Sequence, residues 1–338
     1  MENETLRRWI ESVEPFLAPL TDAAEAFTGL TGIPVDLPTT LFLRADLAGL
    51  ELPGRTSAGG SCHLLETADG WAAVNLARPD DVAAVPALVA LLGGAGTQEL
   101  HDVARRVAAA EIAANAQLLG IAAAALGSAR GTRAPVIAER AERGSRRGPA
   151  GLRIVDLSAL WAGPLCAWLL GQAGARVMKV ESATRPDGAR FGVPAFYRLL
   201  HEGHESRVID FASGALPEVV AEADVVIEAS RPRALRRLGV RAEEFLAARP
   251  GRVWLSITGY GRDQDRIAFG DDAAVAGGLT GIDRNGDPVF LGDALADPVT
   301  GIFAAHAAAR SLAEGGGELL CLSMAACAAA LADSAQGR

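Results

Sequence analysis

Short, nearly continuous apolar runs recur along the second half of the chain, separated by stretches in which apolar residues return with helical spacing. Such a run predicts a strand buried on both faces, and its alternation with helices predicts a parallel sheet covered on either side. The strands are expected at 152–158, 175–181, 206–211, 223–229 and 252–258. We therefore predict an α/β fold in which residues 151–338 form a large, Rossmann-like domain.

The first part of the chain follows a different pattern. Apolar residues have helical spacing at 5–32, 80–93 and 97–120, whereas 64–77 holds two short apolar runs around Asp69 and Gly70, as in a hairpin. These elements predict a smaller α+β domain over residues 1–130. The segment between the two regions is rich in Gly, Arg and Ser and has little apolar periodicity, so we predict a linker over 131–150.

Composition narrows the class of protein. The formal net charge is −9, which disfavours a nucleic-acid binder because phosphate neutralisation needs a basic face. No apolar run is long and uncharged enough to cross a bilayer, and the first residues lack the pattern of a signal peptide, so we expect a cytoplasmic protein that does not bind membranes. The four cysteines form no CxxC pair and the five histidines no ligand cluster, so no metal site is expected.

Ligands of a doubly wound sheet bind beyond the carboxyl ends of its strands. The first such turn reads ALWAGP (159–164), with a single glycine at Gly163. A dinucleotide pyrophosphate needs the GxGxxG pattern to approach the backbone, so a nicotinamide-dependent dehydrogenase is disfavoured. Glu181 ends the second strand as a ribose-binding acid would, but one such match carries little weight.

A second informative region is rich in aspartate and glycine and leads into DPVTG at 297–301. Asp297 and Pro298 open a long apolar helix, 298–313, in the N-cap and N1 arrangement. On spacing alone, Asp297 is an ordinary helix cap.

Six motifs follow one another after residue 150: LRIVDLSALWAGPLCAWLLGQAGARVMKVE (152–181), PDGAR (186–190), HEGHESRVIDF (201–211), ADVVIEASRPRALRRLG (223–239), WLSITGYG (254–261) and LADPVTGIFAAHAAARSL (295–312). Their order and content resemble the large domain of the class III CoA-transferase family (the CaiB/BaiF type), whose superfamily includes formyl-CoA transferase and α-methylacyl-CoA racemase. Residues 57–81 and 111–127 resemble the same family's small domain, which ordinarily follows the large one. The resemblance therefore implies the CoA-transferase III fold in permuted order, by circular permutation or as a slice of a tandem-duplicated ancestor.

The resemblance implies a mechanism. In the family an aspartate carboxylate attacks an acyl-CoA thioester, and CoA passes through an aspartyl-CoA thioester to an acceptor acid. The matching residue is Asp297, with Asp293 as the alternative nucleophile. The family's glycine loop, whose amides approach the acyl group, matches Gly59 and Gly60, and the loop is shorter here.

The resemblance also implies substrates and partners. In the family, CoA contacts come from the first turn, the PDGAR region and the arginine-rich segment that ends in RRLG (236–239). The matching residues here are Leu160, Trp161, Ala162, Arg190, His204 and Arg237. His204 stands where the family has a lysine, which weakens the expected phosphate contact. The implied partners are an acyl-CoA and a carboxylic acid, with no tightly bound cofactor and with CoA as a substrate. Family members form interlocked homodimers, so a homodimer is expected, and whether a permuted chain interlocks is open.

Two other activities fit the same fold. The short glycine loop, the missing lysine and the permutation also fit a repurposed or non-catalytic acyl-CoA-binding homologue. A racemase would need a histidine near 269–272, where this chain has FGDD with Gly270, so racemisation is disfavoured.

Overall fold

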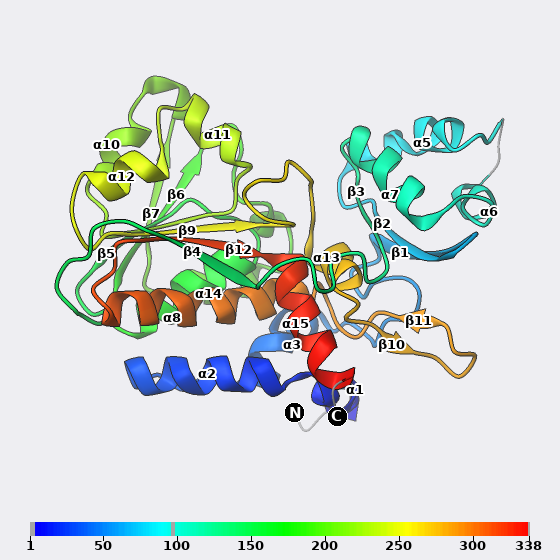
Figure 1. Ribbon diagram of the computed structural model, residues 1–338, viewed down its shortest axis with the longest axis horizontal. Helices are drawn as coiled ribbons and strands as arrows, with labels where there is room; N and C mark the ends of the chain where they lie inside the picture. Colours follow the sequence, from blue (N-terminus) through cyan, green and yellow to red (C-terminus); the bar gives the residue numbers. More distant parts are fainter. Residues whose placement is uncertain (1–3, 96–98, 337–338) are drawn as a thin grey trace.

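The structure is a computed structural model that describes residues 4–95 and 99–336. Its largest feature is a seven-stranded sheet in the order β4-β12-β9-β8-β5-β6-β7 (Figure 1). The strands are β4 Val136–Arg140, β12 Glu318–Ser323, β9 Val253–Thr258, β8 Val225–Glu228, β5 Arg153–Asp156, β6 Arg176–Ser182 and β7 Glu205–Ile209. All neighbouring pairs are parallel except β4 with β12. The α/β fold is confirmed, and the five predicted strands are β5 to β9.

The sheet places a ligand crevice at a defined point. From β5 the chain adds β6 and β7 on one side, whereas β8, β9 and β12 lie on the other side. Strand order therefore reverses between β5 and β8, and the crevice outside their carboxyl ends is where an open α/β sheet binds its ligand. The turn that leaves β5, residues 157–161, starts at this point of the sheet.

Helices cover both faces of the large sheet, as the near-continuous apolar strands predict (Figure 1). One face packs against α8 Ala162–Gln172 and α14 Ala296–Ala313, and α2 Ala18–Thr31 lies beneath α14. The opposite face packs against the helices that lie between β7 and β9 in the chain, which are α10 Leu216–Ala221, α11 Pro232–Arg237 and α12 Ala242–Ala247. The site described below lies on the α8 and α14 side.

The division of the chain differs from the predicted one in two places. Val136–Arg140, inside the predicted 131–150 linker, forms the edge strand β4, because its carbonyls and amides pair with the C-terminal strand β12. The N-terminal helices α1 Glu4–Val13 and α3 Leu37–Ala48 share the large hydrophobic core with α2, α8 and α14, rather than joining the small sheet. Trp9 and Phe42 pack edge to face in that core.

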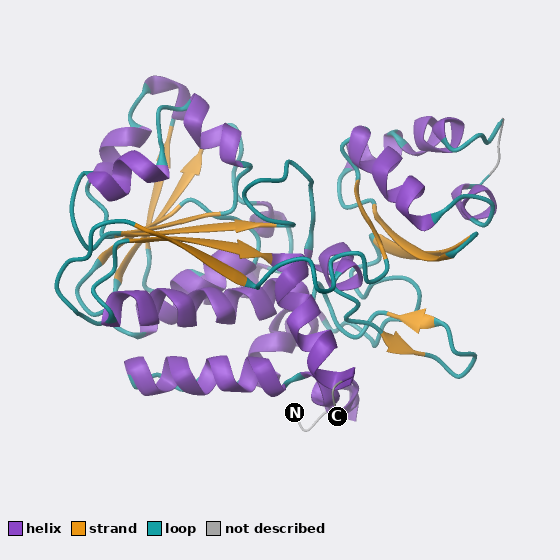
Figure 2. Ribbon diagram, viewed as in Figure 1, coloured by secondary structure: helices purple, strands orange, loops and turns teal. Residues whose placement is uncertain are grey.

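The small unit is a three-stranded antiparallel sheet with helices on one side (Figure 2). Its strands are β1 Cys62–Thr67, β2 Gly70–Asn75 and β3 Ala122–Ala125. The hairpin turn is formed by Ala68 and Asp69, one residue before the predicted Asp69 and Gly70, because Gly70 pairs with Thr67 in the sheet. Its helices are α4 Pro79–Ala83, α5 Val85–Leu91, α6 Leu100–Ala104 and α7 Ala109–Leu118. The helix predicted over 97–120 is therefore broken into α6 and α7, and its first two residues lie outside the described part of the chain.

The remaining elements connect these units. They are α9 Pro194–Leu200, α13 Gly270–Ala276, α15 Met324–Gln336, the two-stranded ribbon β10 Gly281–Ile282 with β11 Pro288–Val289, and the 3-10 turns η1 Glu14–Phe16, η2 Gly188–Phe191 and η3 Phe211–Ser213. Helix α13 packs on β2 and β3 and also on α14 and α15, so it joins the small sheet to the large domain. Within 4–95 and 99–336, no helix combines the length and apolar character that crossing a bilayer requires.

Candidate active site

Asp297 lies in the first turn of α14, and its side chain remains partly exposed to solvent. The prediction that it caps a helix beginning at Pro298 is wrong, because α14 begins at Ala296 and Leu295 occupies the N-cap position. Ala294 adopts a left-handed backbone (φ +47°), and its carbonyl accepts a hydrogen bond from the Asp297 amide at 2.8 Å. The helix therefore starts early, and the Asp297 carboxylate does not cap its own helix.

Instead, the backbone amides of Ala162 and Gly270 lie beside the Asp297 carboxylate and lower its pKa. These are the first residues of α8 and α13, so the amino ends of three helices converge on one carboxylate. Unpaired amides and the helix dipoles favour an anion at such a point. Burial nevertheless raises the pKa of Asp297 to about 6, and Arg44 and the two amides oppose that rise.

Two glycines permit this close approach. A Cβ on Gly270 would lie 2.3 Å from Asp297 Oδ2 and 2.3 Å from the Ala294 carbonyl oxygen. A Cβ on Gly301, one turn further along α14, would lie 2.8 Å from the Ala162 carbonyl oxygen. Both positions need glycine because backbone or the Asp297 carboxylate fills the space that a side chain would take.

Asp293, the alternative nucleophile, is enclosed. Its side chain is fully buried, and Arg44 on α3 donates to both of its carboxylate oxygens, with Nε to Oδ2 at 2.6 Å. The Arg44 guanidinium carbon also lies 5.4 Å from the centre of the Trp161 ring. A carboxylate held in this way cannot reach a substrate, so the geometry favours Asp297 over Asp293 as the reactive group.

Two further buried carboxyls surround the pair. Burial, reinforced by Asp293, raises the pKa of Asp271 to about 7, and its Oδ1 accepts from the Ala294 amide at 2.8 Å. Burial also raises the pKa of Asp272 to about 7, although Phe269 and Asn75 donate to its Oδ1 at 2.9 and 3.1 Å. Arg44 is thus the cation that acts on three of these four carboxyls, Asp271, Asp293 and Asp297.

Arg44, Asp271 and Asp272 belong to no motif from which the sequence predicts a role. In the sequence, Arg44 stands out as a single arginine within the mainly apolar segment LFLRADL (41–47). A lone cation on an apolar helix is expected to pair with a buried anion, but the sequence does not identify the partner 249 positions away.

The predicted glycine loop lies against the Arg44 and Asp293 pair. A Cβ on Gly59 would lie 3.8 Å from both Asp293 Oδ1 and an Arg44 nitrogen. Gly60 is exposed, has a φ of +81° and faces open space. The fold therefore brings residues 59 and 60 beside the loop that carries Asp293 and leads into α14.

The predicted CoA contacts separate into three groups. Leu160, Trp161 and Ala162 form the turn between β5 and α8, and Ala162 is the residue that contacts Asp297. Arg190 and His204 line one cavity of about 250 Å³, which is also lined by Lys179, Tyr197, Arg198, His201 and Ser206. Arg237 is exposed at the end of α11, on the opposite face of the sheet from α8.

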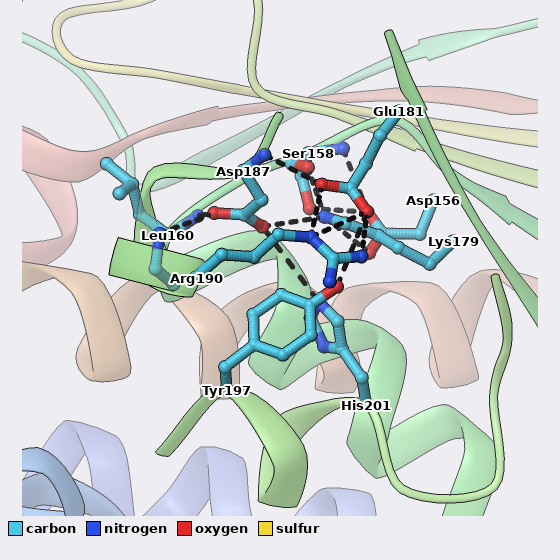
Figure 3. Close-up of polar contacts among 10 residues, drawn as sticks. Asp156, Ser158, Leu160, Lys179, Glu181, Asp187, Arg190, Tyr197 and His201 are labelled. Atoms are coloured by element: carbon cyan, nitrogen blue, oxygen red, sulfur yellow. Dashed lines mark hydrogen bonds and ion pairs between the residues drawn. The ribbon is translucent and has the colours of Figure 1, made fainter. Parts of the chain in front are cut away.

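Arg190 and His204 differ in what they offer a phosphate. Arg190 Nε lies 3.0 Å from Glu181 Oε1 and the guanidinium stacks over Tyr197, as Figure 3 shows, so its charge is already paired. His204 precedes β7, at the amino end of that strand, and burial lowers its pKa. A neutral ring at the end of the strand away from the crevice is a poor phosphate ligand, and the CoA contacts of both residues stay predictions.

Metal ligands were considered separately. In the described ranges, no three His, Cys, Asp or Glu side chains are grouped so that they could hold a metal ion.

Comparison with known proteins places the chain in a family. Residues 150–336 match the family model described as CoA-transferase family III. The chain is 33% identical over 172 residues to the succinyl-CoA–L-malate CoA-transferase beta subunit of Chloroflexus aurantiacus, covering 46% of this chain and 42% of that protein. It is 31% identical over 170 residues to the human succinyl-CoA:glutarate CoA-transferase, covering 46% and 39%. The chain thus spans less than half the length of these curated relatives.

A solved structure shares the fold. A CaiB/BaiF family protein from Brucella suis superposes with a TM-score of 0.51 at 28% identity, over 57% of each chain. The matched family model extends over more than half of the residues and includes the turn at 158–162, α8 and α14. The chain therefore belongs to CoA-transferase family III.

Proposed function

We propose that this protein transfers CoA from an acyl-CoA donor to a carboxylic acid, with the Asp297 carboxylate as the nucleophile. One observation carries the proposal: Asp297 is half-buried, whereas Asp271, Asp272 and Asp293 are buried, and the amides that start α8 and α13 lie beside its carboxylate. The related proteins named as CoA-transferases support the same reaction class.

The chemistry is an exchange between carboxylates and one thiolate. An Asp297 oxygen attacks the thioester carbonyl of the donor and expels CoA thiolate, leaving a mixed anhydride. The thiolate then attacks the Asp297 carbonyl, which releases the donor acid and forms an aspartyl-CoA thioester. The acceptor carboxylate attacks this thioester and expels CoA thiolate, and the thiolate attacks the acyl carbonyl of the new anhydride, which yields acceptor acyl-CoA and restores Asp297.

The surrounding residues suit these steps. Each acyl carbonyl develops negative charge when it is attacked, and preorganised donors stabilise that charge. Arg44 and the amides of Ala162 and Gly270 lower the pKa of the reacting carboxylate, and Gly59 lies beside the Arg44 and Asp293 pair. We further propose that Gly59 and Gly60 approach the acyl group, and that the acyl-CoA thioester enters along residues 160–162.

Racemisation of an acyl-CoA would need a proton-transferring base at the position of Gly270. That position is packed directly against Asp297 Oδ2, so a histidine side chain there would displace the Asp297 carboxylate. Transfer is therefore the activity that the geometry supports best. The homodimer expected from the family resemblance stays a prediction.

The test is to trap the aspartyl thioester. The protein is incubated with succinyl-CoA or acetyl-CoA, reduced with borohydride, digested and analysed by mass spectrometry. A reduced residue 297 is expected in the wild type and none in Asp297→Asn, with CoA affinity changed by less than about threefold. Adduct at residue 293, or an equal yield from the Asp297 variant, would reject the assignment. CoA binding without any adduct would favour a repurposed acyl-CoA-binding protein.

A further inference from the structure

Lys179 is a fully buried cation in the large sheet. It occupies the middle of β6, between β5 and β7, and its side chain has no exposed surface. A lysine is almost never enclosed unless its charge is paired. Here Nζ lies 3.0 Å from Asp187 Oδ2 and 3.5 Å from Asp156 Oδ2. Lys179 also borders the cavity lined by Arg190 and His204, but its side chain has no exposed surface, so its charge acts mainly on the residues packed around it.

The first neighbour is the end of β5. Lys179 Nζ donates to the carbonyl oxygen of Ser158, as the close-up in Figure 3 shows. Asp156 Oδ1 accepts from the Ser158 amide at 2.9 Å and from the Ser158 hydroxyl. The polar groups of Ser158 are therefore all bound within the Lys179 cluster, where the chain leaves the sheet.

The second neighbour is the centre of the following turn. Asp187 Oδ1 accepts from the Leu160 amide at 2.9 Å, while the other oxygen of Asp187 faces Lys179. Leu160 has a φ of +69°, a backbone conformation that costs a residue with a Cβ free energy and needs support. Glu181 fixes Asp187 in turn, because its Oε1 accepts from the Asp187 amide at 2.7 Å.

Two residues after Leu160, the turn ends at Ala162, whose backbone amide lies beside the Asp297 carboxylate. Trp161 packs edge to face on Phe196, and the Arg44 guanidinium lies over the Trp161 ring. Ala162 is the first residue of α8, and its backbone amide lowers the pKa of the Asp297 carboxylate. Any shift of residues 158–160 moves both the Ala162 amide and the surface against which Arg44 packs.

We infer that Lys179 is a positioning residue, which, together with Asp156 and Asp187, holds the 158–162 turn so that the Ala162 amide stays directed at the nucleophilic carboxylate. This inference rests on the proposed function of Asp297. The charge of Lys179 matters because an apolar side chain would leave Asp156 and Asp187 buried without a cation. Those carboxyls would then take up protons or move apart, and the turn would lose its support at Ser158 and Leu160.

The experiment compares Lys179→Met with a matched buried cation. Arg252→Met is the control, because Arg252 is 6% exposed and donates to the Phe245 carbonyl on the opposite face of the sheet, away from the turn. Amide hydrogen exchange at residues 158–162 is measured by mass spectrometry, and the borohydride-trapped adduct is followed as a function of pH. Should Lys179→Met fail to fold, Lys179→Met combined with Asp156→Asn leaves one fewer unpaired charge and is measured instead.

The expected result is local. In the Lys179 variant, exchange at 158–162 rises at least about tenfold, and the midpoint of adduct formation moves to higher pH because Asp297 loses a donor that favours its ionised form. Arg252→Met lowers stability but changes neither measurement. Unchanged exchange in a folded Lys179 variant, or faster exchange with an unchanged pH midpoint, would overturn the inference. A wild type that forms no adduct overturns the proposed function, and the exchange data then still decide whether Lys179 holds the turn.

Discussion

Arg44 on α3 and Asp293 before α14 form a charge pair in which two guanidinium nitrogens donate to the two carboxylate oxygens of Asp293. Asp293 is fully buried, whereas about a third of the Arg44 side chain is exposed. The pair connects the N-terminal helices to the loop that leads into Asp297. It therefore bears on both stability and the candidate active site.

Arg44→Met should destabilise the protein by about 3 kcal/mol, because it leaves a buried carboxylate without its partner. Adding Asp293→Asn should recover part of this loss, since it removes the uncompensated charge. Arg7→Met is the control, because Arg7 pairs with Glu11 on the surface and such pairs contribute about 0–1 kcal/mol. Chemical denaturation of the four proteins measures these differences, and an Arg44 variant as stable as the Arg7 variant would contradict the prediction.

Compared with the wild type, the Asp271→Asn variant should gain stability as pH rises. Burial and Asp293 raise the pKa of Asp271 to about 7 from its ordinary 3.8, so between these values the folded state holds a proton that the unfolded state has released. The stability contributed by Asp271 is therefore present at low pH and is lost as pH rises to about 7. Asparagine keeps an oxygen that accepts from the Ala294 amide and removes this loss.

The measurement is the difference in unfolding free energy between Asp271→Asn and the wild type, from pH 5 to pH 8. A difference is needed because burial lowers the pKa of His201 and His204, which changes stability in the opposite direction over part of this range. We expect a gain of order 1 kcal/mol for the variant across the range. Asp22→Asn on the exposed face of α2 is the control, and a pH-independent difference for Asp271→Asn would refute the assignment.

The sequence predicts the large sheet well because its strands are short apolar runs between helices, a pattern that local residues determine. It misses β4 and β12. The apolar run of β12 leads directly into the alanine-rich helix α15, so no turn residue separates strand from helix. Val136–Arg140 lies mostly on the exposed edge of the sheet, so it lacks the apolar run that revealed β5 to β9. Edge strands of this kind are recognised from their pairing and not from their composition.

The candidate site shows the same limit. The DPVTG motif and the first turn were legible as family motifs, and the fold brings Asp297 and Ala162 into contact. Arg44 and Asn75 come from α3 and β2, and they reach the site only through tertiary packing. Spacing also placed Asp297 at a helix cap, which was wrong because α14 begins at Ala296, two residues before the predicted start, directly after Leu295 and the left-handed Ala294.

Asn75→Ala should loosen the joint between the small sheet and the large domain. Asn75 is 1% exposed on β2, its amide nitrogen donates to buried Asp272 on α13, and its oxygen accepts from Ser61. Removing the donor leaves a buried carboxyl with one partner fewer, at an expected cost of about 1–3 kcal/mol. Asn115→Ala is the control, because Asn115 is partly exposed and donates only to the Glu111 carbonyl of its own helix. Equal stability losses for the two variants would argue against a joint at Asn75.

Gly270→Ala should impair adduct formation while the protein stays folded. The added methyl group would lie 2.3 Å from Asp297 Oδ2, so the carboxylate must rotate away from the Ala162 and Gly270 amides. A displacement of about 1 Å at a reacting group can cost about 100-fold in rate, which is the loss expected in the borohydride trap. CoA affinity should change little, because the 158–161 turn is not displaced directly.

Gly29→Ala is the matched control for this change. Gly29 lies within α2, and nothing stands within 4 Å of its missing Cβ, so alanine should leave the trapping rate unchanged and raise stability by about 0.5–1 kcal/mol. If Gly270→Ala forms the adduct at the wild-type rate, the Asp297 carboxylate does not need its two amide donors. That result would remove the physical basis for placing the nucleophile where the three helices meet.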